Sequence, residues 1–174
     1  MATSAPTKRI VVGIDGSEYA AAALQFAIGM ARAEKAELVA VFAAEPVSHV
    51  YYGGLRGKRL VLPGLDHERR RELRREFEQQ WCRPLIGSDV AYRTVMEAGE
   101  PALVIAWVAE RFDAYIVVVG RRGRGVLAEL ALGSVSHELT HKCPRPVLLV
   151  SNAPVAEPAA SVAAAAAKHP TAPR

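Results

Sequence analysis

Residues 115–150 read YIVVVGRRGRGVLAELALGSVSHELTHKCPRPVLLV, and this stretch decides the fold. The apolar run Ile116–Val119 ends at Gly120, and Gly123 follows within the next turn. Nine residues then separate Gly123 from the pair Gly133-Ser134, which precedes a helical pattern. The order predicts a buried strand, a glycine-rich turn and a helix that begins at Ser134.

The glycines and the helix start indicate an anion site. Glycine lets backbone N–H groups approach an anion without an intervening side chain, and a helix N-terminus presents unpaired donors at the positive end of its dipole. Two such groups facing one crevice would hold a polyphosphate. Arg121, Arg122 and Arg124 lie beside the glycines. They would add charge-assisted hydrogen bonds to the anion. The equally weighted alternative is that they are solvated charges on a surface loop and bind no ligand.

Composition favours a single cytoplasmic domain. The chain has 174 residues, of which 51% are hydrophobic and 23% charged, as is usual for a globular protein. It contains no apolar run near the roughly 20 residues that span a bilayer, and its first residues lack an apolar export segment. The two cysteines, Cys82 and Cys143, form no C-x-x-C pair and are expected to be reduced thiols.

The positive charge does not predict a nucleic-acid partner. The net charge is +4, but the arginines of residues 68–76 alternate with glutamates. This mixture is typical of a solvated helix face, and no aromatic RNA-binding signature accompanies it. We therefore expect no nucleic acid and no membrane as partners.

Strand and helix patterns alternate along the chain. The expected strands are 9–14, 38–44, 90–96, 116–119 and 147–150, and helices are expected to begin at Ser17, Asp66, Pro101 and Ser134. Continuous apolar strands alternating with amphipathic helices predict an α/β fold: a doubly wound five-stranded parallel sheet, flavodoxin-like (Rossmann-like), with helices on both faces. The mixed polarity of 90–96 indicates an edge strand, and residues 45–65 are expected to be a loop.

The helical period predicts which side chains face the core. These are Leu24, Ala27, Ile28 and Ala31 in the first helix, Leu73, Phe77 and Trp81 in the second, and Leu103, Ala106 and Trp107 in the third. Residues 8–152 are expected to form the domain. Residues 1–7 are expected to be flexible, and 153–174 to be a disordered Ala/Pro-rich tail.

Two motifs suggest other functions and are set aside. His137-Glu138-Leu-Thr-His141 spells the H-E-x-x-H motif of zinc hydrolases, but the helix is short and no third ligand follows at a useful distance. The later candidates lie in the tail, so no metal site is expected. The run 123–128 mimics a dinucleotide-binding fingerprint without the βα unit that should follow, and no Walker A sequence occurs.

Three segments together resemble the ATP-binding branch of the universal stress protein family, as a single domain. They are Gly-x2-Gly-x9-Gly-Ser from Gly120 to Ser134, IVVGIDGS at 10–17 and EAGEP at 97–101. They stand in the family's order and at its distances, and the resemblance covers about Lys8 to Ser151. It implies a homodimer whose subunits meet at the last strand, Val147–Val150.

The resemblance also implies the ligand and its contacts. The ligand is ATP with Mg²⁺, and the contacts are Gly13, Asp15, Ala43, Val119, Gly120, Arg121, Gly123, Gly133, Ser134 and Val135. Asp15 would face the adenosine, although it could instead cap the helix that begins near Ser17. Ala43 would meet adenine through its main chain.

The resemblance therefore predicts a cytoplasmic, nucleotide-dependent regulator in stress adaptation, with an unidentified protein partner. No P-loop lysine or catalytic base is identifiable, so no catalytic residue is assigned and an enzyme is not the favoured interpretation. The alternatives are a slow ATPase or self-phosphorylating protein, a cAMP binder of the same fold and, remotely, a zinc hydrolase.

Overall fold

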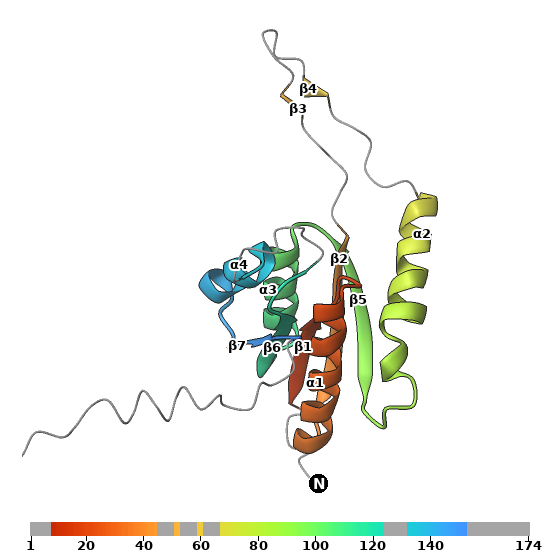
Figure 1. Cartoon of the computed structure of the whole chain (residues 1–174), viewed down its shortest axis with the longest axis vertical. Helices are drawn as coiled ribbons and strands as arrows, with labels where there is room; N and C mark the ends of the chain where they lie inside the picture. Colours follow the sequence, from red (N-terminus) through yellow and green to blue (C-terminus); the bar gives the residue numbers. More distant parts are fainter. Residues whose placement is uncertain (1–7, 45–50, 53–58, 61–66, 124–131, 153–174) are drawn as a thin grey trace, which may run out of the picture.

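A computed structural model describes residues 8–44, 51–52, 59–60, 67–123 and 132–152 of the chain (Figure 1). The expectations for residues 1–7, for 153–174, for Asp66 as a helix cap and for Arg124 lie outside the described residues.

One parallel sheet organises the described chain. Its strands are β1 (Arg9–Gly13), β2 (Glu37–Ala44), β5 (Tyr92–Ala98), β6 (Ile116–Gly120) and β7 (Val147–Val150). They stand in the order β5-β2-β1-β6-β7, and every neighbouring pair is parallel. The predicted five-stranded, doubly wound sheet is confirmed, and β5 and β7 are its edges. The chain moves outward from β1 to β5 and then crosses to β6 on the other side of β1, so the strand order reverses between β1 and β6.

Helices cover both faces of the sheet, as predicted (Figure 1). One face carries α1 (Glu18–Glu34) and α2 (His67–Glu76), which continues into a π-helical turn (Phe77–Trp81) and a 3₁₀ turn (Arg83–Leu85). The other face carries α3 (Pro101–Arg111) and α4 (Ser134–Lys142). Each face has its own apolar core, and no helix among the described residues has the length and apolarity to cross a membrane.

The start and the buried face of α1 follow the sequence. Ser17 is the N-cap, and its Oγ accepts a hydrogen bond of 3.1 Å from the Ala20 N–H. The residues predicted to face inward, Leu24, Ala27, Ile28 and Ala31, are all buried. In the second helix Leu73 and Phe77 are buried and Trp81 is partly buried, with its ring 5.0 Å from that of Phe42.

The predicted inward face of α3 is wrong for Leu103 and Trp107, whereas Ala106 is partly buried and packs against the core. Leu103 and Trp107 are 48% and 45% exposed, and Trp107 stacks under the Arg111 guanidinium at 5.1 Å. The buried residues are instead Ala102, Val104, Ile105, Val108 and Ala109. The helix is apolar on nearly all sides, so periodicity alone selects no face. The packed side is the one whose alanines let the helix approach the sheet.

Two local elements also differ from expectation. The segment expected to be a loop contains β3 (Tyr51–Tyr52) and β4 (Arg59–Leu60), which pair antiparallel. The strand expected at 90–96 is β5, which spans Tyr92–Ala98. It begins later than expected because Asp89 has a left-handed backbone conformation, with φ of 59°, that is not compatible with a strand.

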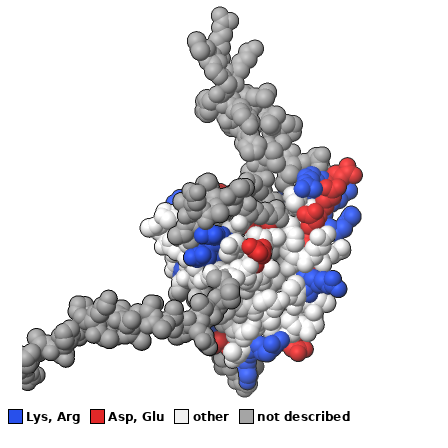
Figure 2. Space-filling model, viewed as in Figure 1, with Lys and Arg blue, Asp and Glu red and all other residues white. Residues whose placement is uncertain are grey.

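Charges of both signs are interspersed on the surface shown in Figure 2. Along the second helix, Arg69 pairs with Glu72 at 3.0 Å, and Arg74 pairs with Glu78 at 3.5 Å. This is the solvated, mixed face that the sequence indicates.

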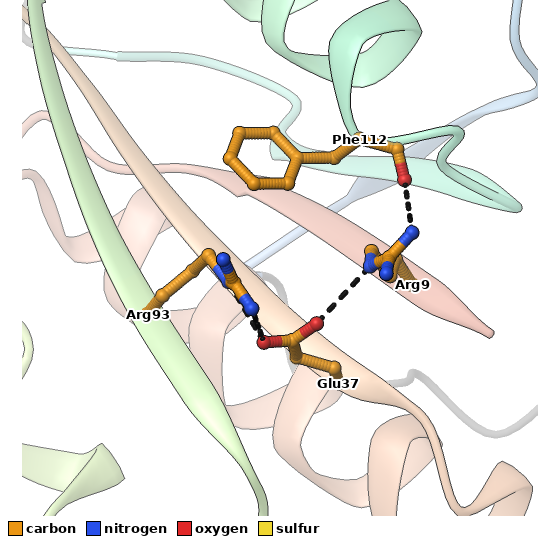
Figure 3. Close-up of polar contacts among 4 residues, drawn as sticks. All are labelled: Arg9, Glu37, Arg93 and Phe112. Atoms are coloured by element: carbon orange, nitrogen blue, oxygen red, sulfur yellow. Dashed lines mark hydrogen bonds and ion pairs between the residues drawn. The ribbon is translucent and has the colours of Figure 1, made fainter. Parts of the chain in front are cut away.

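An ionic cluster joins three strands and the end of α3 at the amino edge of the sheet (Figure 3). Glu37 accepts hydrogen bonds from Arg9 Nε at 3.1 Å and from Arg93 Nε at 2.7 Å. Arg9 also donates to the Phe112 carbonyl at 3.0 Å, and the Arg93 guanidinium lies 5.3 Å from the Phe112 ring centre. Burial alone would raise the pKa of Glu37, but the hydrogen bonds from Arg93 and Arg9 outweigh it and lower that pKa.

Two glycines at the carboxyl edge are required by packing. A Cβ at Gly120 would lie 2.7 Å from the Tyr19 carbonyl carbon, because the first turn of α1 presses against the end of β6. A Cβ at Gly13 would lie 2.9 Å from both Ile105 and Val119 side-chain carbons. The neighbour of Gly120 is backbone, which cannot rotate away.

We predict that Gly120→Ala destabilises the fold by about 1–3 kcal/mol, the usual cost of overpacking a core. Gly29→Ala is the matched control, since its added Cβ meets no atom within 4 Å. In the middle of α1 that change should stabilise by about 0.5–1 kcal/mol. Urea unfolding monitored by circular dichroism measures both. Equal stabilities of the two variants would contradict the packing account of Gly120.

Candidate functional site

The ends of β1 and β6 flank the reversal in strand order, where ligands bind in open α/β sheets. Asp15 lies two residues beyond β1, and Gly120 is the last residue of β6. The turns after these two strands therefore form the candidate site.

Asp15 supports the start of α1. Its Oδ1 accepts hydrogen bonds from the Ser17 backbone N–H at 2.9 Å and from the Ser17 hydroxyl at 2.6 Å. Asp15 therefore holds the N-cap residue in place, in agreement with the capping interpretation. Both contacts are made by Oδ1, and the second carboxylate oxygen is Oδ2.

That second oxygen faces the glycine turn after β6. A Cβ at Gly123 would lie 2.7 Å from Asp15 Oδ2. The two turns therefore meet at this point, and any side chain at Gly123 would displace the Asp15 carboxylate. Glycine is needed here for a close approach between two segments that are far apart in sequence.

Backbone hydrogen bonds close the loop between β6 and α4, called the glycine loop below. They use some of the backbone N–H groups that the sequence predicts as phosphate donors. The Arg121 N–H donates to the Val150 carbonyl at 2.7 Å, and the Gly133 N–H donates to the Arg121 carbonyl at 2.9 Å. The predicted role of the Gly133 N–H is to face a phosphate, but this group donates to the Arg121 carbonyl instead. The N–H groups of Ser134 and Val135 lie in the first turn of α4, where a helix supplies no partner of its own.

Ser136 fixes α4 to the end of β6 and is absent from the predicted site. The residue is 3% exposed, and its hydroxyl donates to the Gly120 carbonyl at 2.7 Å. A signal for it exists in the sequence, because Ser136 precedes the buried Leu139 by three residues and so shares the inner face of the helix.

Arg121 and Arg122 place two incompletely satisfied guanidinium groups beside this loop. Both residues are partly exposed, yet each Nε is buried and has no hydrogen-bond partner in the described part of the chain. The Arg122 backbone also lies against Gly133, whose added Cβ would stand 3.2 Å from the Arg122 Cα. Buried N–H donors without acceptors suit a bound anion.

The remaining predicted contacts are core residues. Val119 and Ala43 are 4% and 9% exposed, Gly13 is buried, and Val135 packs partly buried against the α3 face. Ala43 lies near the end of β2, the neighbour of β1 on the side away from β6. Since the core occupies the Val119 and Ala43 side chains and Gly13 has none, only the main chain of these three residues is available to a ligand.

A hollow of about 210 Å³ opens beside the turn from β1 into α1. It is lined by Ser17, Trp81 and Pro84 among others, and it does not include the glycine loop. The hollow shares the turn after β1 with the candidate site, because Ile14 and Gly16, on either side of Asp15, also line it.

The H-E-x-x-H residues lie on the outer surface of α4. His137 and His141 are exposed, and Glu138 forms an ion pair with Lys142. Among the described residues, no group of three or more His, Cys, Asp and Glu side chains is arranged to hold a metal ion.

Comparisons with known proteins identify relatives of the whole domain. Residues 6–151 match the sequence profile of the Universal stress protein family. A universal stress protein of Synechocystis sp. is 32% identical over 153 residues, covering 83% of this chain and 97% of that protein. One of Bacillus subtilis is 32% identical over 145 residues, covering 82% and 97%.

Solved structures share the fold. A universal stress protein from Lactobacillus plantarum superposes with a TM-score of 0.65 at 21% identity, covering 84% of this chain and 99% of that one. A universal stress protein in complex with cAMP gives 0.61 at 20%, covering 84% and 98%. One from Archaeoglobus fulgidus in complex with dAMP gives 0.58 at 22%, covering 83% and 98%.

We predict that Ser136→Ala destabilises the protein by about 1–3 kcal/mol, because it leaves the buried Gly120 carbonyl without its donor. Ser134→Ala, two residues earlier on the exposed side of the same helix turn, should change the stability little. Thermal unfolding of both variants tests the pair. Indistinguishable midpoints would show that the Ser136 hydroxyl does not hold α4 to β6.

Proposed function

Because this chain belongs to the universal stress protein family, we propose that it binds ATP with Mg²⁺ and acts as a cytoplasmic, nucleotide-dependent regulator in stress adaptation. The proposed domain spans residues 8–152, and the proposed site lies at the carboxyl ends of β1 and β6.

The observation that carries this proposal is the pair of buried guanidinium donors beside the glycine loop. The Nε atoms of Arg121 and Arg122 have no acceptor among the described residues. Leaving a buried donor unpaired costs about 1–3 kcal/mol, and more for a charged group. A polyphosphate at this loop would supply the acceptors, so anion binding is the chemistry that these residues favour.

The proposed contacts divide by chemistry. The Asp15 carboxylate would accept hydrogen bonds from ribose or adenine, and the Ala43 main chain would meet adenine. The Gly123 backbone, the Ser134 hydroxyl and the first-turn N–H groups of Ser134 and Val135 would bind phosphate. The Ser134 oxygen could also contact Mg²⁺, which would offset phosphate charge. The residues that shape the edge around them are Gly13, Val119, Gly120, Arg121 and Gly133.

Polyphosphate is favoured over a cyclic monophosphate by the charges in the loop. The solved complexes with cAMP and with dAMP support an adenine nucleotide as the ligand class for this fold. Two adjacent arginines with unpaired donors match the several negative charges of ATP better than the single charge of cAMP. Comparing the thermal protection by ATP, ADP, AMP and cAMP ranks these ligands directly.

Regulation is favoured over catalysis by the kind of donors at the site. Backbone N–H groups, a serine hydroxyl and the two guanidinium groups can bind ground-state phosphates, whereas hydrolysis also requires contacts that strengthen only in the transition state and a residue that orients the attacking water, to which no residue is assigned. We therefore expect turnover far below the roughly 1–100 s⁻¹ of kinases. The slow ATPase or self-phosphorylating alternative would gain support from multiple turnover that Ser134→Ala abolishes. In the remote zinc-hydrolase alternative, Glu138 would be the base, but it is paired with Lys142.

In this proposal nucleotide occupancy orders residues 121–125 for an unidentified protein partner. Only Arg121, Arg122 and Gly123 of this segment lie among the described residues. Their backbone is joined to β7 and α4 through Arg121, so a ligand at the loop can influence both elements.

We predict that ATP at about one hundred times its Kd stabilises the protein by about 2.7 kcal/mol, because it binds only the folded state. Thermal unfolding with and without MgATP measures this, and we expect a micromolar Kd. Gly123→Glu should abolish the protection by placing a side chain and negative charge beside the Asp15 carboxylate. Gly29→Glu adds the same side chain in open space on α1 and should retain it.

Two milder variants test the site without altering the loop backbone. Ser134→Ala removes an exposed hydroxyl and should weaken protection at unchanged stability. Asp15→Asn keeps an oxygen that can accept from Ser17 while removing the charge, and should also weaken it. Full ATP protection in Gly123→Glu and Ser134→Ala together would eliminate this site.

The proposed assembly is a homodimer through β7. This strand is an edge of the sheet, and all four of its residues are apolar and partly exposed. An apolar edge strand offers unpaired backbone groups to another strand, and two-fold pairing of identical edges would satisfy both copies.

Leu148→Lys should therefore convert a dimer to a monomer in sedimentation at tens of micromolar, because a charge would enter the contact. Tyr92→Lys is the control on the opposite edge strand, β5, and should leave the dimer intact. A monomeric unmodified protein, or a dimer that survives Leu148→Lys, would contradict the proposed interface.

A further inference from the structure

We propose that His137 and His141 form a two-histidine binding site for a divalent transition metal, with Cu²⁺ the preferred ion, on the outer surface of α4. This site is separate from the proposed nucleotide site and involves no hydrolytic role for Glu138.

The spacing of the two imidazoles carries the proposal. His137 and His141 are one turn apart on α4, both are exposed, and their ring centres are 4.7 Å apart with planes tilted by 57°. Metal–imidazole nitrogen distances are about 2.0–2.1 Å, which puts each ring centre roughly 3.2 Å from a shared metal. Two such rings at about 95° around the metal would stand about 4.7 Å apart. The helix therefore already holds the rings at the separation of a chelating pair.

The position of the pair at the end of α4 favours a cation. Glu138, next to His137, forms an ion pair with Lys142. His141 also lies in the last turn of α4, at the negative end of the helix dipole.

The donor set selects the kind of metal. Imidazole nitrogen suits Cu²⁺, Ni²⁺ and Zn²⁺, and affinity along the first-row series peaks at Cu²⁺. Mg²⁺ and Ca²⁺ prefer oxygen ligands and should not bind here. With two protein ligands the ion would keep water in its other positions, so binding should be reversible and the fold should not depend on it. Thiolate competition from Cys82 is weak, since burial raises its pKa to about 12.

The test is a Cu²⁺ titration of the full chain without an affinity tag, in a Cys143→Ser background that removes the partly exposed thiol. Calorimetry should give one Cu²⁺ per chain, and electron paramagnetic resonance should show coupling to two imidazole nitrogens. Mg²⁺ should give no binding signal. Both readouts are independent of nucleotide.

His141→Ala and His137→Ala should each weaken Cu²⁺ binding at least about tenfold, because the second imidazole binds at the high effective concentration of a linked ligand. His67→Ala, on the exposed start of α2, is the matched control and should leave the affinity unchanged. Circular dichroism verifies that each variant is folded. Absence of Cu²⁺ binding in the parent chain, or an affinity unchanged by His141→Ala, would overturn the proposal.

Discussion

The backbone of Gly120 is the point on which the carboxyl edge of this sheet depends. On one face the first turn of α1 approaches so closely that a Cβ would lie 2.7 Å from the Tyr19 carbonyl carbon. On the other face the Ser136 hydroxyl binds the Gly120 carbonyl at 2.7 Å and anchors the start of α4. Both helix N-termini therefore contact the same residue, which has no side chain.

The turns that follow β1 and β6 lie next to these contacts of Gly120. The close approach of α1 places Ser17 beside Asp15, whose carboxylate accepts hydrogen bonds from the Ser17 N–H and hydroxyl. The Arg121 carbonyl, next to Gly120, accepts from Gly133 and so determines where the loop returns to α4. Gly123 and Asp15 are far apart in sequence but close in the fold, since a Cβ at Gly123 would lie 2.7 Å from Asp15 Oδ2.

Arginines at the amino ends and at the carboxyl ends of the parallel strands differ in their hydrogen-bond partners. At the amino edge, Arg9 and Arg93 share the partly buried Glu37 carboxylate, and Arg9 also donates to a backbone carbonyl, so these charges are compensated within the protein. At the carboxyl edge, Arg121 and Arg122 keep buried donors that the described chain does not pair. An internally satisfied cluster contributes stability, whereas unpaired donors suit a ligand. This contrast agrees with the location of ligand sites in parallel α/β sheets.

The sequence by itself determined the strand and helix order, the parallel sheet covered on both faces and the Ser17 cap, because apolar runs, helical periodicity and capping are local properties. It also singled out the glycine segments, since their spacing can be read directly. Tertiary structure alone decided the packed face of α3, because a helix that is apolar on nearly all sides has no unique inner face until small residues meet the sheet. It likewise decided that the Gly133 N–H closes the loop, that Ser136 binds Gly120 and that Gly123 touches Asp15. These contacts join residues from different elements, and the pairing of such residues depends on how the elements pack.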